Sequence, residues 1–254
     1  MRQVPDSTAS ARSPYGFAGD GRLSRHWRHY FSSLGIHWKL WSRGLARAGG
    51  PAPAQALEDC EVILLAVSDD AVAPVLARLR VEGLADRQFV HFCGGRSFPG
   101  AWGAHPLMSF GPALYEPAFY RGIPVFAEAD DARPDAIRRF HALFPALPNP
   151  CFALPIADKA YYHALCALAG GMTAVLWRDF FAAMSSRFGA PREALADYPR
   201  RIVENVLASS NGALTGPVAR GDTGTIEAHL EALDGSSLGA VYRAFIAAAG
   251  AERA

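Results

Sequence analysis

Short apolar runs alternate with helical patterns in the first half of the chain. The clearest run covers residues 61–67 and is continuously apolar after its first position, as expected of a strand covered on both faces. Further strands are expected at residues 15–17, 36–41, 88–93 and 122–127, with helices at 23–34 and 71–80. Strands that alternate with helices predict a parallel sheet with right-handed crossovers, and hence an α/β fold.

Only helical patterns follow a cluster of four prolines, which are Pro145, Pro148, Pro150 and Pro155. Helices are expected at residues 156–188, 191–207, 222–233 and 238–249, with breaks at Asn211-Gly212 and Gly216-Pro217. The domain boundary is therefore expected near residue 150. Residues 1–14 are polar and lack the apolar core of a secretion signal, so we expect a disordered tail there.

One apolar segment has the length of a membrane span. Residues 160–177 contain no Lys, Arg, Asp or Glu, which meets the minimum for a spanning helix. The segment stands alone, however, and its two tyrosines, its histidine and its two glycines weaken partition into hydrocarbon. A helix buried on all sides, inside a domain or a dimer, explains the segment better, so no membrane is expected.

Composition narrows the classes of function. The 254 residues carry a formal net charge of +1, so no basic excess indicates a nucleic-acid surface. The four cysteines have no CxxC or CxxH spacing, so neither a metal site nor a disulfide framework is expected. Free thiols are typical of the reducing cytoplasm, where we expect the protein to be located.

The stretch Gly19-Asp20-Gly21-Arg22-Leu23-Ser24 has the form of a dinucleotide-binding turn. The first glycine permits a tight turn, the second lets a pyrophosphate approach the backbone, and the third position needs a small residue where helix meets strand. The following helix offers N–H groups to the phosphates, and Arg22 is a candidate for one more contact. Such a turn is often only a turn, but its place near the start of the chain favours a Rossmann-type site.

The next expected strand ends in Trp41-Ser42-Arg43, about 20 residues past the turn, where Rossmann domains carry the residue that binds the ribose. An acid there would favour NAD, whereas Ser42 and Arg43, with Arg47 nearby, suit a 2′-phosphate. The sequence therefore predicts NADP in preference to NAD. The alternative is that Arg43 is a solvated arginine on a loop.

These segments together resemble the Rossmann-like proteins that contain a DUF2520 domain, relatives of pyrroline-5-carboxylate reductase, ketopantoate reductase and the β-hydroxyacid dehydrogenases. The resemblance covers the chain from Tyr15 onward and rests on residues 16–22, 62–70, 105–110, 159–164 and 213–225. The last stretch, ALTGPVARGDTGT, is the most specific. Ser24 in the third fingerprint position and a short first strand depart from the pattern of the family.

The resemblance implies a Rossmann domain over residues 15–150, in which Val67 and Ser68 join the cofactor site. It implies a helical domain over residues 151–254, like the C-terminal domain of 6-phosphogluconate dehydrogenase, that serves substrate binding and forms a homodimer. It also implies an NADP-dependent oxidoreductase, without indicating a substrate.

Three residues are candidates for proton transfer. Lys159 and His163 share a helix face and resemble the lysine-x-x-x-asparagine pair of β-hydroxyacid dehydrogenases, which implies that Lys159 acts as acid or base near the nicotinamide. The alternative is a lysine at a helix start with a core histidine one turn later. His105 is expected in a loop past the C-terminal end of a strand, where ligands bind to open parallel sheets. Alternatively, it satisfies backbone groups in that loop.

Two further segments are candidates for substrate binding. Cys93-Gly94-Gly95 resembles the substrate loop of β-hydroxyacid dehydrogenases, and its N–H groups could hold a carboxylate. Arg220 either binds an anionic substrate across a dimer interface or fixes its own loop with Asp222, which would cap the next helix.

The sequence therefore favours an oxidoreductase that transfers a hydride between NADP(H) and a small carbonyl or imine substrate. A non-catalytic dinucleotide-binding sensor is one alternative. A dimeric interaction protein whose nucleotide site has decayed is another.

Overall fold

The computed structural model describes residues 15–131, 134–209 and 214–251. The expected tail at residues 1–14 and the break at Asn211-Gly212 lie outside these residues. Contacts divide the chain into two compact units, Met1–Thr173 and Ala174–Ala254. This division at residue 173 differs from the one expected near residue 150. The first unit also contains the seventh strand of the sheet and the helix that follows it.

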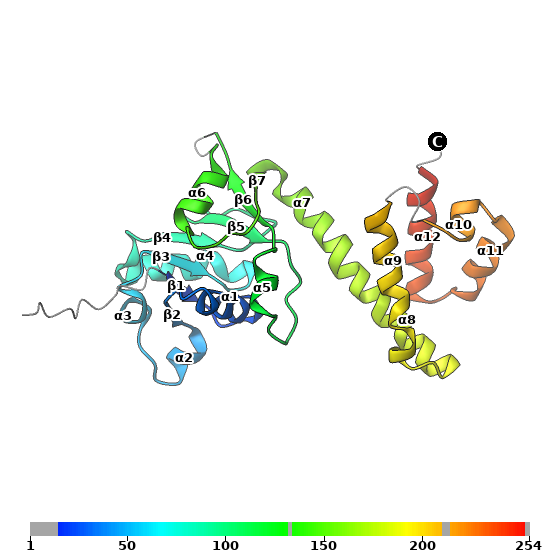
Figure 1. Ribbon diagram of the computed structural model, residues 1–254, viewed down its shortest axis with the longest axis horizontal. Coiled ribbons are helices and arrows are strands. Elements are labelled where there is room, and N and C mark those ends of the chain that lie inside the picture. The colour runs from blue at the N-terminus through cyan, green and yellow to red at the C-terminus, as the bar shows by residue number, and fades with distance from the viewer. Residues whose placement is uncertain (1–14, 132–133, 210–213, 252–254) are drawn as a thin grey trace, which may run out of the picture. The chain divides into compact units, whose positions relative to one another are not determined.

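The first unit is built on a seven-stranded sheet with the order β2-β1-β3-β4-β5-β6-β7 (Figure 1). Its strands are β1 (Tyr15–Ala18), β2 (Trp38–Trp41), β3 (Val62–Leu65), β4 (Gln88–His91), β5 (Trp102–Pro106), β6 (Val125–Ala129) and β7 (Cys151–Pro155). Neighbouring strands are parallel except β5 and β6, which are antiparallel. The mostly parallel α/β architecture is confirmed.

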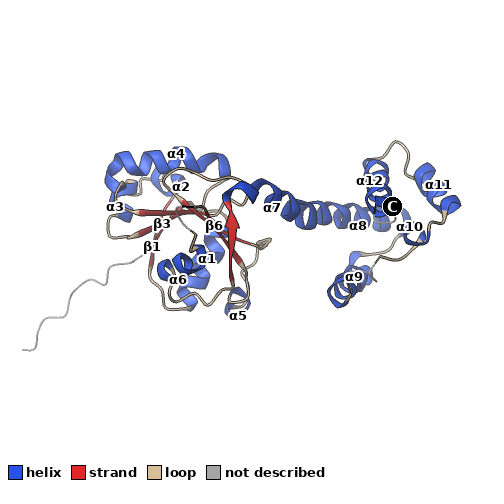
Figure 2. Ribbon diagram, turned by 90° about the horizontal axis from the view of Figure 1, so that it is seen from above, coloured by secondary structure: helices blue, strands red, loops and turns tan. Residues whose placement is uncertain are grey.

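Helices cover both faces of the sheet (Figure 2). The helices of this unit are α1 (Arg22–Ser33), α2 (Arg43–Arg47), α3 (Pro53–Leu57), α4 (Asp69–Leu79), α5 (Pro117–Tyr120), α6 (Ala136–Leu143) and α7 (Lys159–Cys166). Side chains from α1, α5 and α6 enter one buried cluster, and side chains from α3 and α4 enter another. Along β3, Val62 and Leu64 belong to the first cluster, whereas Ile63 and Leu65 belong to the second. This double coverage explains why the strand is apolar at every position.

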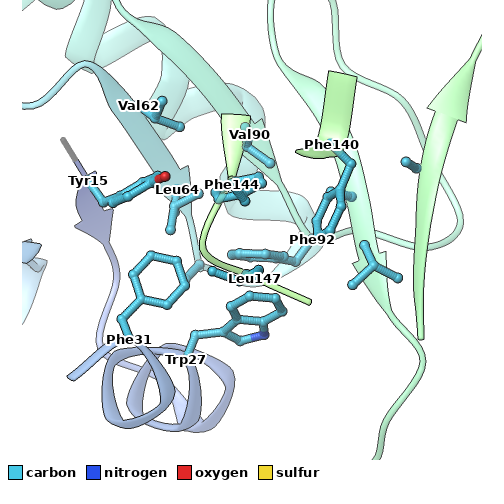
Figure 3. Close-up of a cluster of buried hydrophobic side chains, with 14 of the residues drawn as sticks. Tyr15, Trp27, Phe31, Val62, Leu64, Val90, Phe92, Phe140, Phe144 and Leu147 are labelled. Atoms are coloured by element: carbon cyan, nitrogen blue, oxygen red, sulfur yellow. The ribbon is translucent and has the colours of Figure 1, made fainter. Parts of the chain in front are cut away.

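Aromatic side chains dominate the cluster under α1 (Figure 3). The ring of Phe31 contacts Tyr15 edge-on at 5.1 Å between centroids, and Trp27 stacks on Phe92 at 5.5 Å. Phe92 directly follows the fourth strand and also lines the cavity described below. The core therefore holds α1 in place beside the edge of the sheet where that cavity lies.

The second unit is helical. Its helices are α8 (Thr173–Phe188), α9 (Asp197–Ala208), α10 (Pro217–Arg220), α11 (Thr223–Ala232) and α12 (Ser237–Ala251). This agrees with the helical patterns expected over the C-terminal part of the chain.

A continuous helical segment, Ile156–Phe188, is long and apolar enough to cross a membrane by length and composition alone. None of its most apolar 18-residue window is buried by the described part of the chain. Within the second unit, Trp177 and Phe180 of this segment pack against Tyr198 of α9, with 5.8 Å between the ring centroids of each pair. Burial of the apolar window inside a domain is not confirmed. Burial in a dimer stays a prediction.

Candidate functional site

A cavity of about 410 Å³ lies in the first unit, at the glycine turn that follows β1. Its lining contains seven of the nine residues expected to bind a cofactor: Asp20, Gly21, Arg22, Leu23, Arg43, Val67 and Ser68. Ala66, Asp69 and Phe92 complete the lining. Four segments that are distant in the sequence thus meet at the carboxyl ends of parallel strands, where ligands bind in sheets of this kind.

The two glycines of the turn have different roles. Gly19 has a φ of 116°, and a Cβ there would lie 2.3 Å from the carbonyl oxygen of Ala66. Its N–H donates to the carbonyl of Trp41 at 2.8 Å, which ties the turn to the end of β2. A Cβ on Gly21 would meet no described atom within 4 Å, so this position leaves room for a ligand to approach the backbone.

Ser24 fits the third position of the fingerprint. Its side chain is fully buried, and its hydroxyl donates to the carbonyl of Gly19 at 2.7 Å. The extra polar atom is therefore satisfied inside the turn. Asp20, the acid within the turn, is ion-paired with Arg28 of α1, which offsets its charge near the expected phosphate position.

Ser42 and Arg43 lie at the end of β2. The Ser42 hydroxyl accepts a hydrogen bond from the Leu45 N–H at 3.2 Å and caps α2. Arg43 is exposed and lines the cavity, whereas Ser42 is buried beside it. The cap positions the loop, and Arg43 supplies a positive charge at the cavity.

Lys159 is buried at the start of α7. Its Nζ donates to Glu128 Oε1 at 2.6 Å and to the carbonyl of Cys93 at 2.9 Å. Glu128, on β6, is buried too and was not anticipated from the sequence. Lys159 therefore neutralises a buried acid and holds the loop that begins at Cys93.

Glu128 connects several segments around that loop. Its Oε1 accepts from Ser97 Oγ at 2.7 Å, and its Oε2 accepts from the Gly103 N–H at 2.9 Å. His91 Nδ1 accepts a hydrogen bond from the Cys93 N–H, so the proton of the ring is on Nε2. This Nε2 lies 3.3 Å from Glu128 Oε1. Burial raises the pKa of Glu128, but the hydrogen bonds from these side chains outweigh it and lower that pKa to about 2.

His105 and His163 meet at the Gly94-Gly95 turn, with ring centroids 5.8 Å apart and perpendicular planes. A Cβ on Gly94 would lie 2.7 Å from His163 Cδ2 and 3.0 Å from His105 Cδ2, so only glycine allows this approach. His105 lies within β5, not in a loop as expected, because residues 102–106 extend the sheet. Its Nδ1 is 2.8 Å from the hydroxyl of Tyr162, a second residue that the sequence did not indicate.

Burial, and next the neighbouring His163, lower the pKa of His105 to about 4, so the ring is neutral at physiological pH. Burial has the opposite effect on the Cys93 thiol and raises its pKa, and a hydrogen bond to Asp69 adds to this increase. The backbone N–H groups of Gly95 and Arg96 act in the opposite direction and lower the pKa of the thiol. The role of this loop in holding a carboxylate stays a prediction.

Arg220 lies in the second unit, at the end of α10. Its guanidinium pairs with Asp222 at 2.7 Å, and the Asp222 side chain makes no capping hydrogen bond to α11. The geometry accordingly fits a pair that fixes the loop between the two helices.

Comparison with solved structures shows the fold. BF3122 from Bacteroides fragilis, assigned as an NADP oxidoreductase, is 18% identical with a TM-score of 0.73, over 93% of this chain and 97% of that chain. TM1727 from Thermotoga maritima is 22% identical with a TM-score of 0.63, over 94% and 100%. Pyrroline carboxylate reductase from Plasmodium falciparum, with NADP bound, is 15% identical with a TM-score of 0.59, over 92% and 94%. No curated protein matches the sequence.

These structures place the first unit among Rossmann-like folds, as its sheet order and glycine turn indicate. A family model described as a domain of unknown function, DUF2520, matches residues 123–249, half of the chain. The matched residues include Glu128, Lys159 and Tyr162. The chain therefore belongs to the DUF2520 family.

Proposed function

We propose that this protein is an oxidoreductase that transfers a hydride between NADP(H) and a small carbonyl or imine substrate. The observation that carries the proposal is the cavity at the glycine turn, where Gly21 leaves the backbone open and Arg43 supplies a positive charge. The cavity is suited to a dinucleotide because its wall combines bare backbone with the first turn of α1.

Residues of the first unit would hold the cofactor. Residues 19–23 would receive the pyrophosphate, and Val67 and Ser68 would line the same cavity. Arg43 would bind a 2′-phosphate, which supports NADP in preference to NAD. Among similar structures, an imine reductase from Myxococcus stipitatus is in complex with NADP+, and its V8 variant is in complex with NAD+. When bound, such a cofactor supplies the hydride.

The heteroatom of the substrate needs a hydrogen-bond donor as the hydride arrives. His105 and His163 are the proposed groups, because both rings border the Gly94-Gly95 turn. Lys159 would act on the reaction indirectly, since its ammonium group donates to Glu128 and to the Cys93 carbonyl. Its charge also helps to keep His105 neutral.

We also propose that the protein is a soluble cytoplasmic homodimer and that the two copies contact each other through the long helix. Four exposed apolar side chains, Tyr161, Leu165, Leu168 and Met172, recur at alternating spacings of four and three residues along it. This spacing produces one apolar stripe, of the kind that a second helix covers.

The test of the enzymatic proposal is a turnover assay that follows nicotinamide absorbance. Purified protein with NADPH is offered 1-pyrroline, small aldehydes and small ketones, each with and without protein. The proposal predicts NADPH oxidation with at least one class of substrate, and loss of that activity in Gly21→Ala. Binding of NADPH without oxidation by any compound would instead support a non-catalytic sensor.

A further inference from the structure

The imidazole of His105 has one nitrogen engaged and one free. Nδ1 lies 2.8 Å from the Tyr162 hydroxyl. Among the described residues Nε2 has no hydrogen-bond partner, and it lies beside the bare backbone of Gly94, where a Cβ would be 3.1 Å away. The ring is therefore anchored from behind and presents its other nitrogen to the glycine turn.

The direction of the Tyr162 hydrogen bond determines which nitrogen carries the proton. The Tyr162 hydroxyl lies within hydrogen-bond distance of His105 Nδ1, at 2.8 Å. A phenol O–H is a stronger donor than an imidazole N–H, and an imidazole nitrogen is a stronger acceptor than a phenol oxygen. The favoured hydrogen bond therefore runs from the Tyr162 O–H to His105 Nδ1.

We propose that Tyr162 is a positioning residue that fixes His105 as the Nε2–H tautomer, so that the neutral ring offers an N–H to the heteroatom of the substrate. The inference rests on the proposed function and assigns a role within it. A hydrogen-bond donor aimed at the atom where negative charge develops stabilises the transition state, and a fixed tautomer keeps that donor in place.

The surroundings keep the ring neutral. The titratable groups that act on it, besides Tyr162, are Asp69, His91, Lys159 and His163. Only Asp69 favours the imidazolium, and its effect is smaller than those of burial, His163 and Lys159. Since the pKa of His105 falls to about 4, the Nε2–H donor is present throughout the neutral range.

Two matched variants separate the hydroxyl from the ring. Tyr162→Phe retains the aromatic contact with Phe126, whose ring centroid is 4.7 Å away, and removes only the donor to His105. Tyr161→Phe removes a hydroxyl from the adjacent, 71% exposed tyrosine and serves as the control.

The deciding measurement is the ¹⁵N NMR spectrum of histidine-labelled protein without substrate, with His105 assigned by its loss in His105→Gln. We expect a protonated Nε2 and an unprotonated Nδ1 from neutral pH to about pH 5, both in wild type and in Tyr161→Phe. Tyr162→Phe should shift His105 toward the other tautomer. An Nδ1–H tautomer in wild type, an imidazolium at pH 6, or an unchanged spectrum in Tyr162→Phe would each overturn the proposal.

A kinetic readout then tests the link to turnover. With NADPH and the substrate that the turnover assay identifies, Tyr162→Phe should lower kcat on the order of 10-fold, as loss of such orienting partners does, with the Kd for NADPH unchanged. Equal kcat values for Tyr162→Phe and Tyr161→Phe would contradict the positioning role. If no substrate is oxidised or reduced, the proposed function fails, and the NMR result still decides the tautomer.

Discussion

At the scale of single residues, we expect Gly19 to be needed for stability and Gly21 to be needed for cofactor binding. Gly19→Ala places a side chain at positive φ and against the Ala66 carbonyl, so it should lower the free energy of unfolding by about 2 kcal/mol or more. Gly21→Ala meets no described atom and should leave stability nearly unchanged while it weakens NADPH binding. Chemical denaturation and cofactor titration of both variants check this. Equal losses of stability would contradict the division of roles.

Lys159 and Glu128 form a pair whose members depend on each other. Lys159→Met leaves a buried carboxylate without its partner and should cost about 3–5 kcal/mol of stability. The double variant Glu128→Gln with Lys159→Met removes both charges and should regain most of that loss. Urea denaturation of the two variants tests this, and a double variant no more stable than Lys159→Met would contradict it.

The same pair predicts a pH dependence. Glu128 has a folded pKa of about 2, below its ordinary value near 4.5, so the unfolded chain binds the proton first as the pH falls. Its contribution to stability is therefore complete above about pH 4.5 and is lost as the pH falls toward 2. In the double variant this part of the acid dependence should disappear.

At the scale of elements, Asn149 joins three parts of the first unit. It accepts from the Tyr30 hydroxyl on α1 and donates to the carbonyls of Tyr120 and Ile123, with all three distances between 2.7 and 2.9 Å. Asn149→Ala removes the partner of the Tyr30 hydroxyl and of the Ile123 carbonyl and should cost roughly 2–4 kcal/mol in urea denaturation. The exposed Asn205→Ala is the control, expected to change stability by less than about 0.5 kcal/mol. Similar losses of stability in both variants would contradict this role of Asn149.

Two strands show which elements can be predicted from the sequence and which cannot. The strand at Val62–Leu65 is predictable because burial on both faces makes every position apolar. The strand at Trp102–Pro106 contains a glycine and a proline, which are signals for turns. Gly103 is needed there because a Cβ would lie 2.5 Å from the Glu128 carboxylate. Such a requirement comes from a partner 25 residues away in the sequence and leaves no local pattern.

The candidate site divides in the same way. The glycine turn and Arg43 follow from local spacing, since a phosphate site is built from consecutive residues and a strand end. Glu128 and Tyr162 escaped prediction because their partners are 31 and 57 residues away. Their roles depend on how β5, β6 and α7 pack, which hydrophobic periodicity does not specify.

At the scale of the whole molecule, the exposed apolar stripe on the long helix makes a dimer the central structural prediction. Sedimentation velocity should show a dimer for wild type. Leu168→Glu, which places a charge on the apolar stripe, should give monomers, whereas Ala167→Glu, which lies off the stripe, should not. A monomeric wild type at micromolar concentration would contradict the dimer.

The central claim is that the first unit binds NADP(H), and a titration with NADPH and NADH, followed by nicotinamide fluorescence, tests it most directly. The account predicts that NADPH binds about 10-fold more tightly than NADH or better, and that Arg43→Ala removes this difference without changing NADH binding. Equal affinities in wild type would refute the role of Arg43. No binding of either nucleotide at millimolar concentration would contradict the oxidoreductase proposal itself.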